Sequence, residues 1–362
     1  MLDPFALLIG AVSRPSVSGQ ERLVAEYLVA QLRRFASEAF IDAAGNVVAR
    51  LGRGARHVMV LGHIDTVPGE IPVRIEDNVL FGRGAVDAKG ALCAAIAAAA
   101  QLSPEVLDGL TLTIIGAVEE EAPSSKGARY AVTAYPKPDL VIIGEPSGWD
   151  AMTIGYKGRL VIKLSCQRAN FHSARDEASA AELLVEAWLS LRAWALRCNE
   201  GIVGLFDRVQ LSLQGINSDS NGLSQRADAV VGLRLPPKLS PQAAEKAARD
   251  CLAPYPGLSL SFAGHESAYR SPKDTPLTRA FRVAIRAAGG KPRLMVKTGT
   301  SDMNVVAPYW DVPMLAYGPG DADFDHRPDE QLPLAEYQRA IDVLQLALVR
   351  LATDRAGAAG WD

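Results

Sequence analysis

Short apolar runs followed by acidic residues or histidine recur along this chain. Residues 111–118 are apolar at most positions, as a buried strand is, and Glu119, Glu120 and Glu121 follow directly. Three adjacent carboxylates at the end of a strand repel one another and resist burial, and a bound cation would remove that conflict. A solvated acidic turn is the alternative for this segment taken alone.

Other predicted strands end in the same way. Residues 57–62 precede His63, residues 139–144 precede Glu145, and residues 314–318 precede the loop that carries His326. Asp87 lies in a glycine-rich loop ahead of an alanine-rich run. Parallel α/β sheets bind ligands at the carboxyl ends of their strands, so these side chains should meet at one edge. A lone histidine after a strand is more often an ordinary hydrogen-bonded loop residue, but five ligand-type residues together favour a metal site.

The order of the predicted elements indicates two folding units. Strands and helices alternate up to residue 156, which predicts an α/β domain with a mostly parallel sheet and flanking helices. Strands at 159–166, 208–213 and 227–235 and helices at 178–197 and 240–252 follow, and the β/α pattern returns at 277–289. We therefore predict a catalytic domain made of residues 1–156 and 266–362, and an inserted smaller α+β domain at 157–265.

One helix start has a specific signature. Ser18 and Glu21 have the spacing of a capping box, in which each side chain bonds a backbone amide of the other residue. This spacing predicts a helix that opens here, with Leu28 and Leu32 near its apolar face.

Composition narrows the class of protein. The 362 residues are 48% hydrophobic and 22% charged with a net charge of −3, which is typical of a globular enzyme and indicates neither nucleic-acid nor membrane binding. No secretory signal is visible at the N-terminus, and the four cysteines form no Cys-x-x-Cys pair, so we expect reduced thiols and a cytoplasmic location. A structural zinc site built on paired cysteines is disfavoured, which leaves histidine and carboxylate ligands.

His63 and Asp65 form a short motif of their own. Residues two apart in an extended segment point the same way, so Asp65 could hold the far ring nitrogen of His63 and fix its tautomer for a metal. Together with segments 82–90, 119–121, 144–146 and 325–330, this pair resembles the co-catalytic zinc amidohydrolase and peptidase family of acetylornithine deacetylase, succinyl-diaminopimelate desuccinylase and bacterial glutamate carboxypeptidase. The resemblance covers nearly the whole chain in the same order.

The resemblance implies an amide hydrolase with two divalent metal ions per subunit, zinc first, with cobalt or manganese as substitutes. His63 and Glu145 would bind one ion, Glu121 and His326 the other, and Asp87 both. Glu120 would be the general base and acid, and Asp65 the partner of His63. A base at Glu119 with a ligand at Glu120 is the alternative register.

The inserted domain would be the family's lid or dimerisation domain. Residues 170–174 match a segment whose histidine, here His172, reaches the active site of the partner subunit in a homodimer and stabilises the oxyanion. A structural role for His172 is the alternative.

A narrower likeness concerns the substrate. Residues 84–90, 117–129 and 297–304 are similar to the lysine-biosynthesis branch of the family, whose members release lysine, and in some cases ornithine, from the C-terminal glutamate of a small acidic amino-group carrier protein. A deacylase of acetyl-lysine or acetyl-ornithine, or a dipeptidase, is the alternative. The carboxylate of a lysine product needs cationic or hydroxyl partners, and Arg234, Thr300 and Ser301 are the candidates, although Arg234 could equally be a surface strand residue. A nucleotide-binding enzyme is disfavoured because the glycines at 82 and 84 belong to no complete phosphate-binding motif.

Overall fold

The computed structural model describes residues 2–172, 174 and 176–353. Their packing divides the chain into two compact units. Unit 1 comprises Met1–Gly155, Ser271–Val296 and Ser301–Asp362, and unit 2 comprises Tyr156–Arg270 and Lys297–Thr300. Each unit has its own hydrophobic core. The domain boundaries drawn from the sequence stay a prediction.

Unit 1 is built on one mixed sheet. Its strands run in the order β1 (Glu38–Ile41), β2 (Val47–Gly52), β6 (Leu110–Ala117), β3 (Arg56–His63), β7 (Leu140–Gly144), β15 (Met314–Ala316) and β8 (Ala151–Tyr156), and β14 (Arg293–Lys297) also pairs with β8. The central strands β6, β3, β7 and β15 are parallel, whereas β1, β2 and β8 pair antiparallel with their neighbours. The predicted α/β class is confirmed.

The register of the parallel strands aligns their carboxyl ends. His63, the last residue of β3, lies opposite Ala117, the last residue of β6, and Gly62 lies opposite Gly144 at the end of β7. Any side chain that follows one of these strands therefore emerges beside those that follow the other two.

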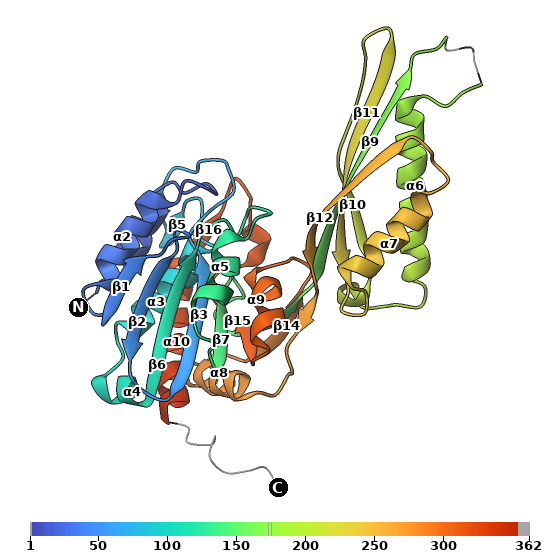
Figure 1. Cartoon of the computed structure of the whole chain (residues 1–362). Coiled ribbons are helices and arrows are strands. Elements are labelled where there is room, and N and C mark those ends of the chain that lie inside the picture. Colours follow the sequence, from blue (N-terminus) through green and yellow to red (C-terminus); the bar gives the residue numbers. More distant parts are fainter. Residues whose placement is uncertain (1, 173, 175, 354–362) are drawn as a thin grey trace. The chain divides into compact units, whose positions relative to one another are not determined.

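Helices cover the sheet. They are α1 (Pro4–Val12), α2 (Arg22–Leu32), α3 (Lys89–Ala99), α4 (Pro104–Gly109), α5 (Lys126–Ala134), α8 (Pro276–Ala287), α9 (Asp302–Trp310) and α10 (Leu334–Thr353). Every residue of α3 is buried, because it packs between the sheet and its neighbours α1 and α10. Figure 1 shows α3 and α10 behind the strands. A small sheet of β4 (Arg74–Glu76), β5 (Val79–Phe81) and β16 (Gln331–Pro333) joins the segment before Asp87 to the segment after His326.

The predicted capping box is wrong. Helix α2 begins at Arg22, and no side-chain hydrogen bond caps it. The Ser18 hydroxyl donates instead to Asp65 Oδ2 at 2.7 Å, and Glu21 Oε1 accepts from the Gly19 amide at 2.8 Å and from the Glu119 amide at 3.1 Å. Both side chains therefore bond groups at the ends of β3 and β6. Ser18 bonds the Asp65 carboxylate, and Glu21 bonds the backbone amide of Glu119.

Unit 2 is a smaller α+β fold. Its antiparallel sheet has the order β10 (Gln210–Ser220), β11 (Ser224–Leu235), β9 (Gly158–Ala169) and β12 (Leu258–Glu266). The short β13 (Tyr269–Arg270) comes next in sequence and is not part of this sheet. Helices α6 (Ala180–Cys198) and α7 (Pro241–Leu252) lie against this sheet (Figure 1). Their apolar side chains form a core with those of the sheet. Buried residues alternate along β9, as expected of a strand with one face covered. In the described part of the chain, no helix combines the length and apolar character needed to cross a bilayer.

Candidate metal centre

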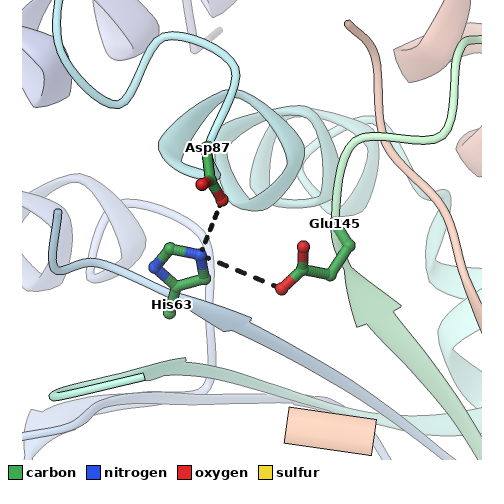
Figure 2. A group of neighbouring side chains, drawn as sticks. All are labelled: His63, Asp87 and Glu145. Carbon is green, nitrogen blue, oxygen red and sulfur yellow. Dashed lines mark hydrogen bonds and ion pairs between the residues drawn. The ribbon is translucent and has the colours of Figure 1, made fainter. Parts of the chain in front are cut away.

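Three strand ends and two loops bring the predicted ligands together. His63 ends β3, Glu120 and Glu121 follow β6, and Glu145 directly follows β7. His63 Nε2 lies 3.2 Å from Asp87 Oδ1 and 3.9 Å from Glu145 Oε1. Figure 2 shows both carboxylates turned toward this ring nitrogen.

A second group of side chains shares Asp87 with the first. His326 Nε2 lies 3.1 Å from Asp87 Oδ2 and 2.8 Å from Glu121 Oε1. The two oxygens of Asp87 therefore face two different histidines. This is the arrangement expected of a carboxylate that bridges two ions.

The donor set fits divalent cations. Three groups, His63 with Asp87 and Glu145, His63 with Glu120 and Glu121, and Asp87 with Glu121 and His326, each place their ligand atoms within 4.8 Å of one another. His63, Asp87 and Glu145 are buried. Buried carboxylates that converge on imidazole nitrogens are costly unless a cation or protons balance them, and mixed nitrogen and oxygen donors suit zinc-like ions.

Asp65 connects the ends of β3 and β6. Its carboxylate accepts hydrogen bonds from the amides of Glu120 and Glu121, each at 3.0 Å, as well as from Ser18. The closer partner of His63 Nδ1 is the Asp65 backbone carbonyl at 3.0 Å, with the carboxylate Oδ1 at 3.4 Å. Asp65 thus orients His63 and also fixes the backbone that carries the next two acids.

The three consecutive glutamates point to different places. Glu119 has a positive φ of 57°, and its carboxylate accepts from the Ser124 hydroxyl at 2.6 Å and pairs with Lys126 at 3.5 Å. Glu120 and Glu121 instead join the group around His63. This orientation favours the register in which Glu120 and Glu121 serve the centre.

The electrostatics of the centre favour positive charge among its side chains. Burial opposes the charged form of His63, but hydrogen bonds with Asp65 and Asp87 outweigh it and raise the pKa of His63 well above its usual value. Hydrogen bonds with Asp87 and Glu121 raise the pKa of His326 to about 10. Burial raises the pKa of Glu120 well above its usual value and also raises that of Glu121. In the metal-free chain, protons therefore balance carboxylates that cations would otherwise balance.

The other predicted site residues are placed as follows. In unit 2, Arg234 Nη1 donates to the Thr300 hydroxyl, which in turn donates to the Lys157 carbonyl. Ser301, in unit 1, accepts the Met303 amide at 3.2 Å and caps α9. His172 lies exposed in the loop after β9 in unit 2, where its Nδ1 accepts from the Ala174 amide at 3.2 Å.

Two further acidic residues of this region, Asp302 and Glu330, were not predicted as site residues from the sequence. Asp302 is buried at the first turn of α9, and neither of its carboxylate oxygens has a hydrogen-bond partner among the described residues. Burial raises the pKa of Asp302 to about 7. Glu330 is fully buried and accepts from the amides of Val86 and Asp87. The only signal for either was its place in a segment that carries the family resemblance.

Comparison with known proteins agrees with this geometry. Residues 59–350 match the family model described as Peptidase family M20/M25/M40. The chain belongs to this family. The resemblance drawn from the motifs is thereby confirmed, and the chain is a metal-dependent hydrolase of amide bonds.

Individual members are similar over nearly their full length. A LysW-lysine hydrolase from Deinococcus radiodurans is 55% identical over 349 residues, which cover 95% of this chain and 96% of that protein. A protein from Pyrococcus furiosus, provisionally named LysW-lysine/LysW-ornithine hydrolase, is 38% identical over 341 residues, which cover 94% of each chain. The crystal structure of an M20 family metallo-carboxypeptidase from Sulfolobus solfataricus superimposes with a TM-score of 0.81 at 18% identity, over 98% of this chain and 100% of that one, which shows the shared fold.

The orientation of the glutamates generates a test of the register. Glu120→Gln should keep metal and lose about 10²–10⁴-fold in kcat, because the amide cannot accept a proton. Glu119→Gln is the matched control, since its carboxylate faces Ser124 and Lys126, and should retain both metal and activity. Metal analysis and steady-state kinetics of the two variants check this. An inactive Glu119→Gln beside an active Glu120→Gln would reverse the register.

The raised histidine pKa values predict a pH trend for the metal-free fold. His63 and His326 bind their protons more tightly when folded, so their contribution to stability is full below about pH 6.5, their ordinary value, and declines as pH rises toward the value of about 10 for His326. In a chelator, the Tm should fall between about pH 6.5 and about pH 8, and it should fall less for His326→Asn. Zinc affinity should rise over the same range, because the ligands must lose their protons. Equal slopes for the two chains in the chelator would contradict the assignment.

Proposed function

We propose that this chain releases lysine, with ornithine as a further candidate, by hydrolysing the amide that joins it to the C-terminal glutamate of a small acidic amino-group carrier protein. The observation that carries the proposal is the identity of 55%, over nearly the full length, to a LysW-lysine hydrolase. The ligand-type side chains at the carboxyl edge of the sheet support the chemistry. A biosynthetic role of this kind fits the cytoplasmic location expected from the unpaired cysteines.

We propose a dinuclear centre with zinc in both positions, replaceable by cobalt or manganese. His63 and Glu145 would hold one ion, Glu121 and His326 the other, and Asp87 both, which agrees with the two directions of the Asp87 oxygens. When bound, the ions polarise the amide carbonyl and lower the pKa of water to near neutrality. The mixed imidazole and carboxylate donors support this choice of metal.

Glu120 is the proposed proton carrier. Its carboxylate takes a proton from the attacking water as the oxygen bonds to the amide carbon, and returns it to the nitrogen as the carbon–nitrogen bond breaks. The backbone amide of Glu120 is held at 3.0 Å by Asp65, which limits movement of the base. A hydrogen-bond donor must also meet the oxygen anion, and His172 is the proposed residue.

Arg234 and Thr300 are the proposed contacts for the carboxylate of lysine. They are already hydrogen-bonded to each other in unit 2, so they present a guanidinium and a hydroxyl at one place. Ser301 is proposed as a third contact. Its hydroxyl now caps α9, so substrate would have to share it with the Met303 amide.

A homodimer through unit 2 is proposed as well. Strand β10 is an edge strand with most of its residues exposed, among them Leu213 and Ile216. Helix α6 exposes Val185, Leu189 and Leu196. An uncovered strand edge and exposed apolar side chains favour association with a second copy.

The substrate is tested by direct comparison. Carrier-linked lysine should give a higher kcat/KM than acetyl-lysine, acetyl-ornithine or dipeptides, and a chelator should abolish the activity until zinc or cobalt is restored. Added salt should lower kcat/KM for the carrier substrate only, because charge steers an acidic protein to its enzyme. Glu120→Gln controls for contaminating hydrolases. Faster turnover of an acetyl substrate, with no salt effect on the carrier, would favour the deacylase alternative.

The shared site is tested by mixing two inactive variants. His172→Ala should keep its metals and lose most of kcat. After subunit exchange with Glu120→Gln, part of the activity should return, because each hybrid dimer has one site with both Glu120 and the partner's His172. Exchange verified by mass spectrometry without any recovery would contradict a role for His172 across the dimer.

A further inference from the structure

Glu330 occupies an unusual place for a carboxylate. Its side chain is 0% exposed, and it comes four residues after His326 in the segment that leads into β16. Taking a carboxylate out of water is expensive, and a well-packed apolar side chain commonly does as much for stability. The position of Glu330 therefore calls for a reason beyond packing.

The hydrogen bonds of Glu330 converge on the loop that carries Asp87. Its Oε1 accepts from the amides of Val86 at 2.9 Å and Asp87 at 3.1 Å, and its Oε2 accepts from Arg83 Nη1 at 2.8 Å. Bonds to an ionised acceptor are about twice as strong as neutral ones, so this one carboxylate holds the loop at three points.

The backbone supports the same connection. In the antiparallel ladder of β16 and β5, Gln331 lies opposite Phe81, and the next step places Glu330 opposite Gly82, whose amide donates to the Glu330 carbonyl at 3.3 Å. Segment 82–87 and segment 326–330 are thus joined through a single residue. Each segment contributes one of the side chains that meet at 3.1 Å, Asp87 and His326.

We propose that Glu330 is a positioning residue for the metal centre: it fixes the backbone of Asp87 so that one carboxylate oxygen faces His63 while the other faces His326. Asp87 has little tolerance for rotation, because its oxygens meet partners in two directions at 3.2 and 3.1 Å. Arg83 pairs with Glu330 Oε2, the oxygen that does not accept from the loop amides. This inference rests on the dinuclear centre of the proposed function.

Cobalt binding to the purified full chain tests the inference without depending on activity. In Glu330→Gln, only the side-chain oxygen can accept a hydrogen bond. If it accepts from the loop amides, the NH2 group faces the Arg83 guanidinium, and if it accepts from Arg83, the NH2 group faces the loop amides. Either orientation sets two donors against each other. Affinity for cobalt, measured by competition with a chelator, should fall about 10–100-fold, as it does when partners that orient metal ligands are lost, and the cobalt absorption spectrum should change.

Glu266→Gln is the matched control. Glu266 is also buried, at 4% exposure, and pairs with Arg159 at 3.2 Å, but it belongs to unit 2. The control should be less stable to heat and should bind cobalt as the wild type does. If Glu330→Gln fails to fold, Glu330→Asp keeps the charge but shortens the reach to the loop amides, and should show the same loss of cobalt affinity.

The outcomes distinguish a failure of the proposed metal centre from a failure of the role of Glu330. Failure of the wild-type chain to bind two cobalt ions would overturn the proposed centre and this inference with it. Binding by the wild type, with unchanged affinity and spectrum in a folded Glu330→Gln or Glu330→Asp, would overturn the role of Glu330 alone. A loss shared equally by Glu266→Gln would also overturn it, since the effect would then be general destabilisation.

Discussion

Electrostatic repulsion at one edge of the sheet is the constraint on which the rest of unit 1 depends. Asp65, Asp87, Glu120, Glu121 and Glu145 gather where β3, β6 and β7 end. Coulomb repulsion between buried like charges is strong, so the fold must supply compensation close by. It does so with backbone amides, which Asp65 receives from residues 120 and 121, and with imidazoles, which Asp87 receives from both sides. A bound cation would relieve the repulsion that remains.

The elements with strong periodicity could be predicted from the sequence. The long apolar strands β3, β6 and β7, the strand β9 and the helices α6 and α7 all lie where the patterns place them. The strands of the small sheet were missed because runs of three residues carry no periodicity, and β16 pairs with β5 from 250 residues away in the sequence. Helix α9 was missed because its first turn carries two buried polar residues, Asp302 and Asn304, in place of an apolar stripe.

The site residues also divide into those that a local sequence pattern predicts and those that depend on long-range contacts. Residue type and position after a strand were enough to select His63, Glu145, His326 and the triplet 119–121 as candidate positions, since parallel register brings strand ends together. The choice of Glu121 within the triplet came from the family resemblance. The direction of each glutamate in the triplet was not accessible, because it depends on the left-handed backbone of Glu119. Ser18 and Glu21 misled for a related reason. A capping signature is local, and here a long-range partner, the acidic edge, bonds both side chains.

The way unit 2 enters the chain has a consequence for how such proteins diversify. The chain leaves unit 1 after Gly155 and returns at Ser271, and all five proposed ligands lie in unit 1. Insertions, deletions and drift in the 156–270 segment can therefore accumulate without disturbing the strand register that assembles the centre. Selection can act on substrate reach and on self-association while the metal ligands are inherited unchanged. One ancestral reaction could in this way come to serve free amino-acid derivatives in one lineage and a protein-borne amide in another.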